Sequence, residues 1–93
     1  MSPPDEAEAL GWHSAPEFWS ANRAEQRFVD GHQLIAFDLP VAGGFPAEIG
    51  WELFGGVGCA TLIATGQVAT FEAAKAAAEA ALTARARLPL SGE

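Results

Sequence analysis

Residues 48–88 leave few possible folds, because a strand, a glycine turn, a second strand and a capped helix follow one another directly. The segments read EIGWELF, GGVG, CATLIAT and TFEAAKAAAEAAL. Two strands joined by a short turn form an antiparallel hairpin, and the helix that follows must bury its apolar side on one hairpin face. Because 93 residues suffice for one modest core, we predict a single α+β domain over residues 13–89 after a flexible acidic tail at residues 1–12.

The first strand of this hairpin, residues 48–54, alternates between two kinds of side chain. Ile49, Trp51 and Leu53 share one face, which we expect to lie against the core. The other face carries Glu48, Gly50 and Glu52. Phe54 has the parity of the glutamates and is expected to be exposed at the end of the strand.

Two further strands are predicted, one before and one after this strand in the sequence. Residues 58–65 are apolar or hydroxylated throughout, which indicates a central strand with Cys59 as a small core residue. Residues 33–39 form another candidate strand, which ends before Pro40 because proline cannot donate to a ladder.

The C-terminal segment is a helix with a clear beginning. Thr70 is a favourable N-cap residue, and Glu72 in the first turn suits the helix dipole. The apolar side of the helix carries Phe71, Ala74, Ala78, Ala81 and Leu82. The side turned to solvent is expected to carry Glu72, Lys75, Glu79, Thr83 and Arg87.

The N-terminal part of the chain is less determined. Ser14 and Glu17 match a capping box, which predicts a helix over residues 15–26. Residues 27–32 then either end this helix or form a short strand that turns through Asp-Gly into the next one. The prediction is therefore an antiparallel sheet of three or four strands, packed by a C-terminal Ala-rich helix and an N-terminal helix.

Charge is distributed unevenly along the chain. The net charge of −7 disfavours direct binding to nucleic acid or to anionic membranes. No lysine or arginine lies between Phe28 and Ala74, so we expect the charged groups of the sheet to be acidic. The acidic start also lacks the basic and apolar order of a signal peptide, which predicts a cytoplasmic protein.

Candidates for catalysis or metal binding are few. His13 and Glu17 are spaced like two ligands on a helix, but a metal site needs at least a third. His32 follows a predicted turn, and FGGVGCAT lacks the Lys-Ser/Thr of a phosphate loop. We therefore expect that the protein is not an enzyme and binds no metal and no cofactor. A minor hypothesis is a minimal catalytic site formed by His13, His32 and Glu17.

Acidic and aromatic side chains on one sheet surface are typical of protein recognition, since aromatic residues anchor interfaces and charge steers encounter. We predict contacts with a protein partner at Asp38, Glu48, Glu52 and Phe54.

The run Trp51-Glu52-Leu53, the glycine hairpin, Gly66 and the helix opening TFEAA resemble small uncharacterised proteins of bacteria and their phages. The same stretch is similar to the sheet-and-helix half of HicB-type antitoxins. Short acidic phage proteins also include anti-CRISPR inhibitors, an analogy of size and charge. The resemblance implies an inhibitor or antitoxin-like module of a phage or mobile element.

The functional expectation is thus a non-enzymatic, acidic protein-binding module that docks on a basic, nucleic-acid-binding protein surface. The alternative is a small homo-oligomeric structural, accessory or antitoxin-like protein, in which an exposed strand edge pairs with a second copy.

Overall fold

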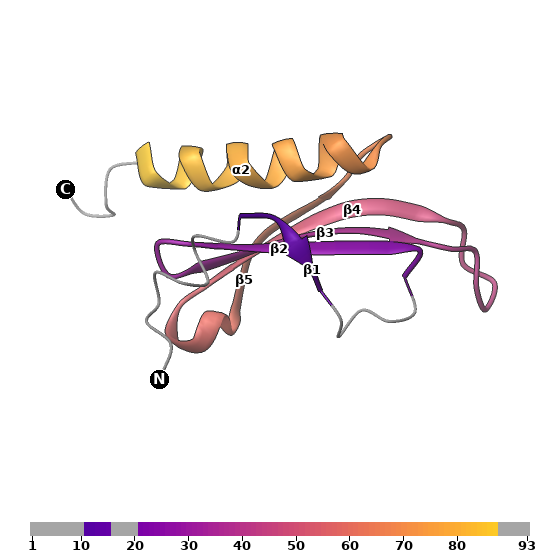
Figure 1. The fold of residues 1–93 in the computed structure, drawn as a ribbon, viewed down its shortest axis with the longest axis horizontal. Helices are drawn as coiled ribbons and strands as arrows, with labels where there is room; N and C mark the ends of the chain where they lie inside the picture. Colours follow the sequence, from indigo (N-terminus) through magenta and orange to yellow (C-terminus); the bar gives the residue numbers. More distant parts are fainter. Residues whose placement is uncertain (1–10, 16–20, 88–93) are drawn as a thin grey trace.

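The computed structural model describes residues 11–15 and 21–87. Within these ranges, five antiparallel strands form one sheet in chain order, and one helix lies across a single face of it (Figure 1). The elements are β1 (His13–Ser14), β2 (Arg23–Val29), β3 (His32–Leu39), β4 (Glu48–Gly55), the 3-10 turn η2 (Val57–Cys59), β5 (Thr61–Gln67) and α2 (Phe71–Arg87). The predicted α+β class is confirmed, with more strands than expected.

The core lies between α2 and the two central strands. Leu34 of β3 and Leu53 of β4 are fully buried and pack against Ala78 of α2. A second cluster joins Ala36, Phe71 and Ala74. These contacts confirm the predicted apolar side of the helix. Its alanine side chains are small, so α2 can lie close to the sheet.

The N-cap of α2 is also confirmed. The Thr70 hydroxyl accepts a hydrogen bond of 3.0 Å from the amide of Ala73, which satisfies one of the free donors of the first turn. No helix within the described ranges is long and apolar enough to cross a membrane.

The predicted N-terminal helix is wrong for the residues that the structure describes. Residues 23–29 form β2, which pairs with β3 along its whole length, from Arg23 opposite Asp38 to Val29 opposite His32. Asp30 and Gly31 both have positive φ, of 49° and 75°, as a two-residue hairpin turn requires. Of the two alternatives for residues 27–32, the hairpin is confirmed, and it extends the strand back to Arg23.

Ser14 of the expected capping box lies in β1, a two-residue strand paired with β2. The remainder of that box and the first part of the expected helix, residues 16–20, lie outside the described residues, as do residues 1–10 of the expected tail. The sheet of the described residues has five strands, whereas three or four were predicted.

The second correction concerns the returning strand. It begins at Thr61 rather than at residue 58, because Val57–Cys59 form a 3-10 turn in which Cys59 has a positive φ of 54°. Cys59 is half-buried there and is not a core strand residue. Among the described strands, β5 pairs with β4 alone, so it lies at the edge of this sheet instead of its centre.

Candidate protein-binding face

The side of the sheet away from α2, here called the open face, carries three of the four predicted contact residues. Glu48, Glu52 and Phe54 alternate along β4 with the residues that pack against the helix. All three side chains are half-buried, so Phe54 is less exposed than expected. No described helix or strand packs over this face (Figure 1).

Asp38, the fourth predicted contact residue, is on the other side of the sheet. Its parity in β3 is that of the core residues Leu34 and Ala36. The Asn22 amide donates a 3.4 Å hydrogen bond to its carboxylate. Because the sheet separates Asp38 from the β4 glutamates, it does not form one surface with them.

The register determines which residues surround the β4 positions on the open face. Glu52 lies opposite Ile35 of β3 and Thr65 of β5, and Phe54 lies opposite Gln33 and Leu62. The open-face residues of the described strands are His13, Ala24, Gln26, Phe28, Gln33, Ile35, Phe37, Leu39, Glu48, Gly50, Glu52, Phe54, Leu62, Thr65 and Gln67. The face thus combines apolar groups, amides and two carboxylates.

The apolar part of the open face is well packed. Ile35 and Phe37 are only 3% and 8% exposed although they point away from the helix. The Phe37 ring lies directly over Gly50, where an added Cβ would come within 2.8 Å of it. The absence of a side chain at residue 50 therefore lets the Phe37 ring approach the backbone of β4 closely.

Two polar and aromatic pairs extend the face toward β1. The Gln33 amide donates a 2.9 Å hydrogen bond to the Gln26 side chain, and the rings of His13 and Phe28 have centroids 6.1 Å apart. Sequence reasoning missed Gln26 because it was assigned to the end of a helix over residues 15–26, and it considered His13 only as a metal ligand or catalytic group. The signal that could have identified the strand is the Asp30-Gly31 hairpin turn, because the residues before such a turn pair with those after it.

Glu52 is in an unfavourable electrostatic environment. Its partial burial beside Ile35 raises the pKa of its carboxyl, and the negative charge of Glu48 on the same face raises it further. A positive charge placed beside Glu52 would favour its ionised form and so act against both effects.

Glu52→Gln is expected to raise the melting temperature at neutral pH by a few degrees. Between the ordinary pKa of 4.5 and the raised pKa, the folded state binds more protons than the unfolded state, so stability falls as pH rises through this window. The gain in melting temperature should disappear at pH values below the ordinary pKa of 4.5. Thermal denaturation across pH tests this, and Glu48→Gln should give a smaller gain; a lower melting temperature for Glu52→Gln at neutral pH would contradict it.

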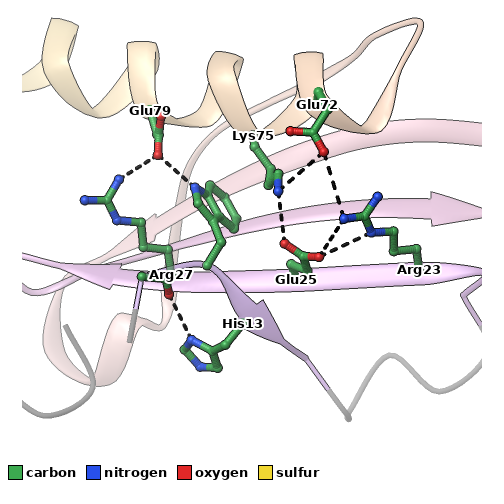
Figure 2. A network of polar contacts seen from close by, with 9 residues as sticks. His13, Arg23, Glu25, Arg27, Glu72, Lys75 and Glu79 are labelled. Carbon is green, nitrogen blue, oxygen red and sulfur yellow. Dashed lines mark hydrogen bonds and ion pairs between the residues drawn. The ribbon is translucent and has the colours of Figure 1, made fainter. Parts of the chain in front are cut away.

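The opposite side of the sheet contains the bases. Arg23 and Arg27 of β2 point toward α2, so the expectation of a purely acidic sheet is wrong. Figure 2 shows that they form ion pairs between sheet and helix, together with Lys75. Every base whose side chain the structure describes, namely Arg23, Arg27, Lys75 and Arg85, is on this side.

One half of this network is centred on Glu25. Its carboxylate accepts hydrogen bonds from Arg23 at 2.9 Å and from Lys75 at 3.1 Å. The Arg23 guanidinium also lies 4.1 Å from the centre of the Phe71 ring. Burial alone would raise the pKa of Glu25, but the hydrogen bonds and charges of Lys75 and Arg23 outweigh it and hold that pKa below its usual value.

The other half is centred on Glu79, whose carboxylate accepts hydrogen bonds from Arg27 at 2.6 Å and from the Trp12 indole at 2.8 Å (Figure 2). The expectation that Lys75 and Glu79 face solvent is thus wrong, because β2 supplies charged partners beneath the helix. With these side chains paired across the helix–sheet interface, the open face of the described strands carries Glu48 and Glu52 and no lysine or arginine.

The residues of the minor catalytic hypothesis do not come together. The His13 ring is on the open face and contacts the Gly11 carbonyl, whereas His32 contacts the Asp30 carbonyl and Arg85 of α2. Glu17 lies outside the described residues. Among the described residues, no group of three or more His, Cys, Asp or Glu side chains is arranged to hold a metal ion.

Comparisons with known proteins add no family to these observations. No protein-family model, curated protein or solved structure matches the chain. The resemblance to small phage proteins and HicB-type antitoxins therefore stays a prediction, and the open face itself is the basis for assigning a function.

Proposed function

We propose that this chain is a non-enzymatic protein-binding or inhibitor module whose open face docks on a basic surface of another protein. The observation that carries the proposal is the separation of charge by the sheet. Glu48 and Glu52 are on the open face, and the described bases are all on the helix side. A surface with acids, amides and packed aromatic groups is complementary to a basic surface with an apolar centre.

A protein partner fits this face better than nucleic acid does. Carboxylates at Glu48 and Glu52 would repel phosphates, and the net charge of −7 acts in the same direction. The basic partner surface would be one that normally holds nucleic acid, as expected for an anti-CRISPR-like inhibitor. Two carboxylates form a sparse array compared with a phosphate backbone, so steric blocking is the mechanism that we propose.

The test is affinity capture with variants matched in net charge. Glu48→Gln/Glu52→Gln removes two acids from the open face, and Ala76→Lys/Ala80→Lys adds two bases on exposed positions of α2. Each double variant changes the net charge from −7 to −5. The tagged proteins are incubated with a bacterial lysate that contains CRISPR effector proteins, and bound proteins are identified by mass spectrometry.

Wild type and the helix variant are expected to retain the same basic partner in a salt-sensitive manner. The open-face variant should bind it about tenfold more weakly, because two partly buried ion pairs of about 0.5–1 kcal/mol each are lost. Equal retention by all three proteins would contradict the assignment of this face, whatever the partner is.

A second candidate function, that of a homo-oligomeric accessory or antitoxin-like protein, is supported by a different observation. β5 is an edge strand without any charged residue.

A further inference from the structure

β5 has the composition of a central strand but lies at an edge. Its sequence, TLIATGQ, contains no charged residue and no proline, and the uncharged stretch around it runs from residue 53 to residue 71. Exposed edges in monomeric proteins are normally blocked by charges, prolines, short strands or bulges, because free backbone groups invite pairing. Among these devices β5 has only a bulge, at Ile63.

The opposite edge of the sheet is protected in the usual way. β1 covers part of β2, and β2 itself carries Arg23, Glu25 and Arg27, which are bound to the helix network. Of the two edges of the described sheet, β5 is therefore the one open to pairing with a strand of another chain.

The backbone groups available on β5 follow from its pairing with β4. The amide of Val68 donates to the carbonyl of Ile49, so in an antiparallel ladder Gly66 and Ala64 also turn their groups toward β4. Thr65 and Gln67 then direct their N–H and C=O groups to the outside, and both residues are exposed. α2 lies mainly over β3 and β4 and leaves this edge accessible (Figure 1).

We infer that the β5 edge pairs with the β5 edge of a second copy of this chain, in antiparallel orientation. A second copy fits because β5 contains no charged residue, so two chains with a net charge of −7 can pair along it without bringing like charges into contact. Two identical strands that pair in antiparallel orientation are related by a twofold axis. Each outward N–H group of one strand can then donate to an outward C=O group of the other.

The twofold axis is perpendicular to the sheet, so the two sheets continue into one another with both helices on the same side. The two open faces then form a single surface that carries Glu52 and Phe54 twice. With strands about 4.8 Å apart, the two copies of Glu52 are separated by about 14 Å, beyond the screening length of about 8 Å at physiological salt. Their repulsion therefore does not prevent pairing, and the dimer offers a bivalent form of the proposed binding face.

A seven-residue edge is smaller than the interface of a tight dimer, so we expect a dissociation constant of about 1–100 μM. Sedimentation equilibrium of the purified full chain should show the mass rising with concentration from 9.7 kDa toward twice that value. Thr65→Lys/Gln67→Lys places two charges on the edge and should remain monomeric. The control, Ala76→Lys/Ala80→Lys, has the same net charge and should dimerise like wild type.

A second measurement does not depend on the variants folding. In wild type, hydrogen exchange at the amides of Thr65 and Gln67 should slow as the protein concentration increases, whereas exchange on β3 should not change. A monomer mass for wild type up to about 1 mM, or dimerisation of the edge variant equal to the control, would overturn the inference. The bivalent role depends on the proposed function, but the pairing is measured without a partner, so the two can fail separately.

Discussion

Replacing Leu53 by alanine is expected to lower the free energy of unfolding by about 2–5 kcal/mol. Leu53 is fully buried between its β3 neighbour Leu34, its β5 neighbour Ala64 and Ala78 of the helix. The lost side chain leaves a cavity that three separate elements would have to move to fill. A domain of this size has a total stability of only about 5–14 kcal/mol, so the variant loses a large fraction of it.

Thermal denaturation followed by circular dichroism is the direct measurement, because about 1 kcal/mol corresponds to about 4–8 °C in a domain of this size. Leu62→Ala is the matched control: the same substitution on the neighbouring strand, at a side chain that is 49% exposed. It should cost less than about 1 kcal/mol at the same protein concentration. If both variants lost equal stability, the side of β4 that α2 covers would have to be reassigned.

The second large effect is expected for Lys75→Met, which keeps most of the length of the unbranched side chain and removes its charge. The Lys75 and Glu25 side chains are only 18% and 20% exposed, and their charged atoms are 3.1 Å apart. Without Lys75, the partly buried carboxylate of Glu25 retains Arg23 as its charged partner. We expect a loss of about 1–2 kcal/mol at neutral pH, below the loss for Leu53→Ala.

The pH dependence of this loss identifies its origin. Because the pKa of Glu25 is lowered in the folded protein, the ion pair contributes stability above the unfolded value of 4.5 and loses it as pH falls through the lowered pKa. The difference in unfolding free energy between wild type and Lys75→Met should therefore shrink in acid. A difference that is the same at all pH values would mean that Lys75 acts through packing on the Trp12 and Phe71 rings instead.

A double variant completes the test. Glu25→Gln/Lys75→Met removes both members of the Lys75–Glu25 pair and leaves Arg23 with Glu72, at 3.9 Å, as its carboxylate partner. Because both single variants break the same Lys75–Glu25 pair, the loss of stability in the double variant at neutral pH should be smaller than the sum of the two single losses. A double variant whose loss equals the sum of the two single losses would show that the side chains are not coupled.

Prediction from sequence succeeded where the signal is local. The alternation of residues 48–54 predicted the two faces of β4, and the Thr70 cap with its apolar spacing predicted α2. Each of these signals is complete within a few residues, because a strand repeats every two residues and a helix about every 3.6. The open-face positions of Glu48, Glu52 and Phe54 follow from the same alternation.

β2 could not be identified in this way because its side toward the helix is charged. The positions that face the helix are charged, namely Arg23, Glu25 and Arg27, so the segment shows no apolar alternation that would indicate a buried strand face. Its sequence resembles that of a polar helix. They can lie under α2 only because Lys75 and Glu79, about fifty residues away, supply the opposite charges. A pattern that depends on partners so distant is not visible in a local window.

The sequence by itself determined the composition of β5, a strand without charge, and the alternation of β4. Only the tertiary structure decided that β5 is an edge and that the bases of β2 turn toward the helix, leaving the acids of β4 on a face of their own. The physical reason is that side-chain periodicity is set by each residue and its neighbours, whereas strand order and ion pairing are set by contacts between distant segments.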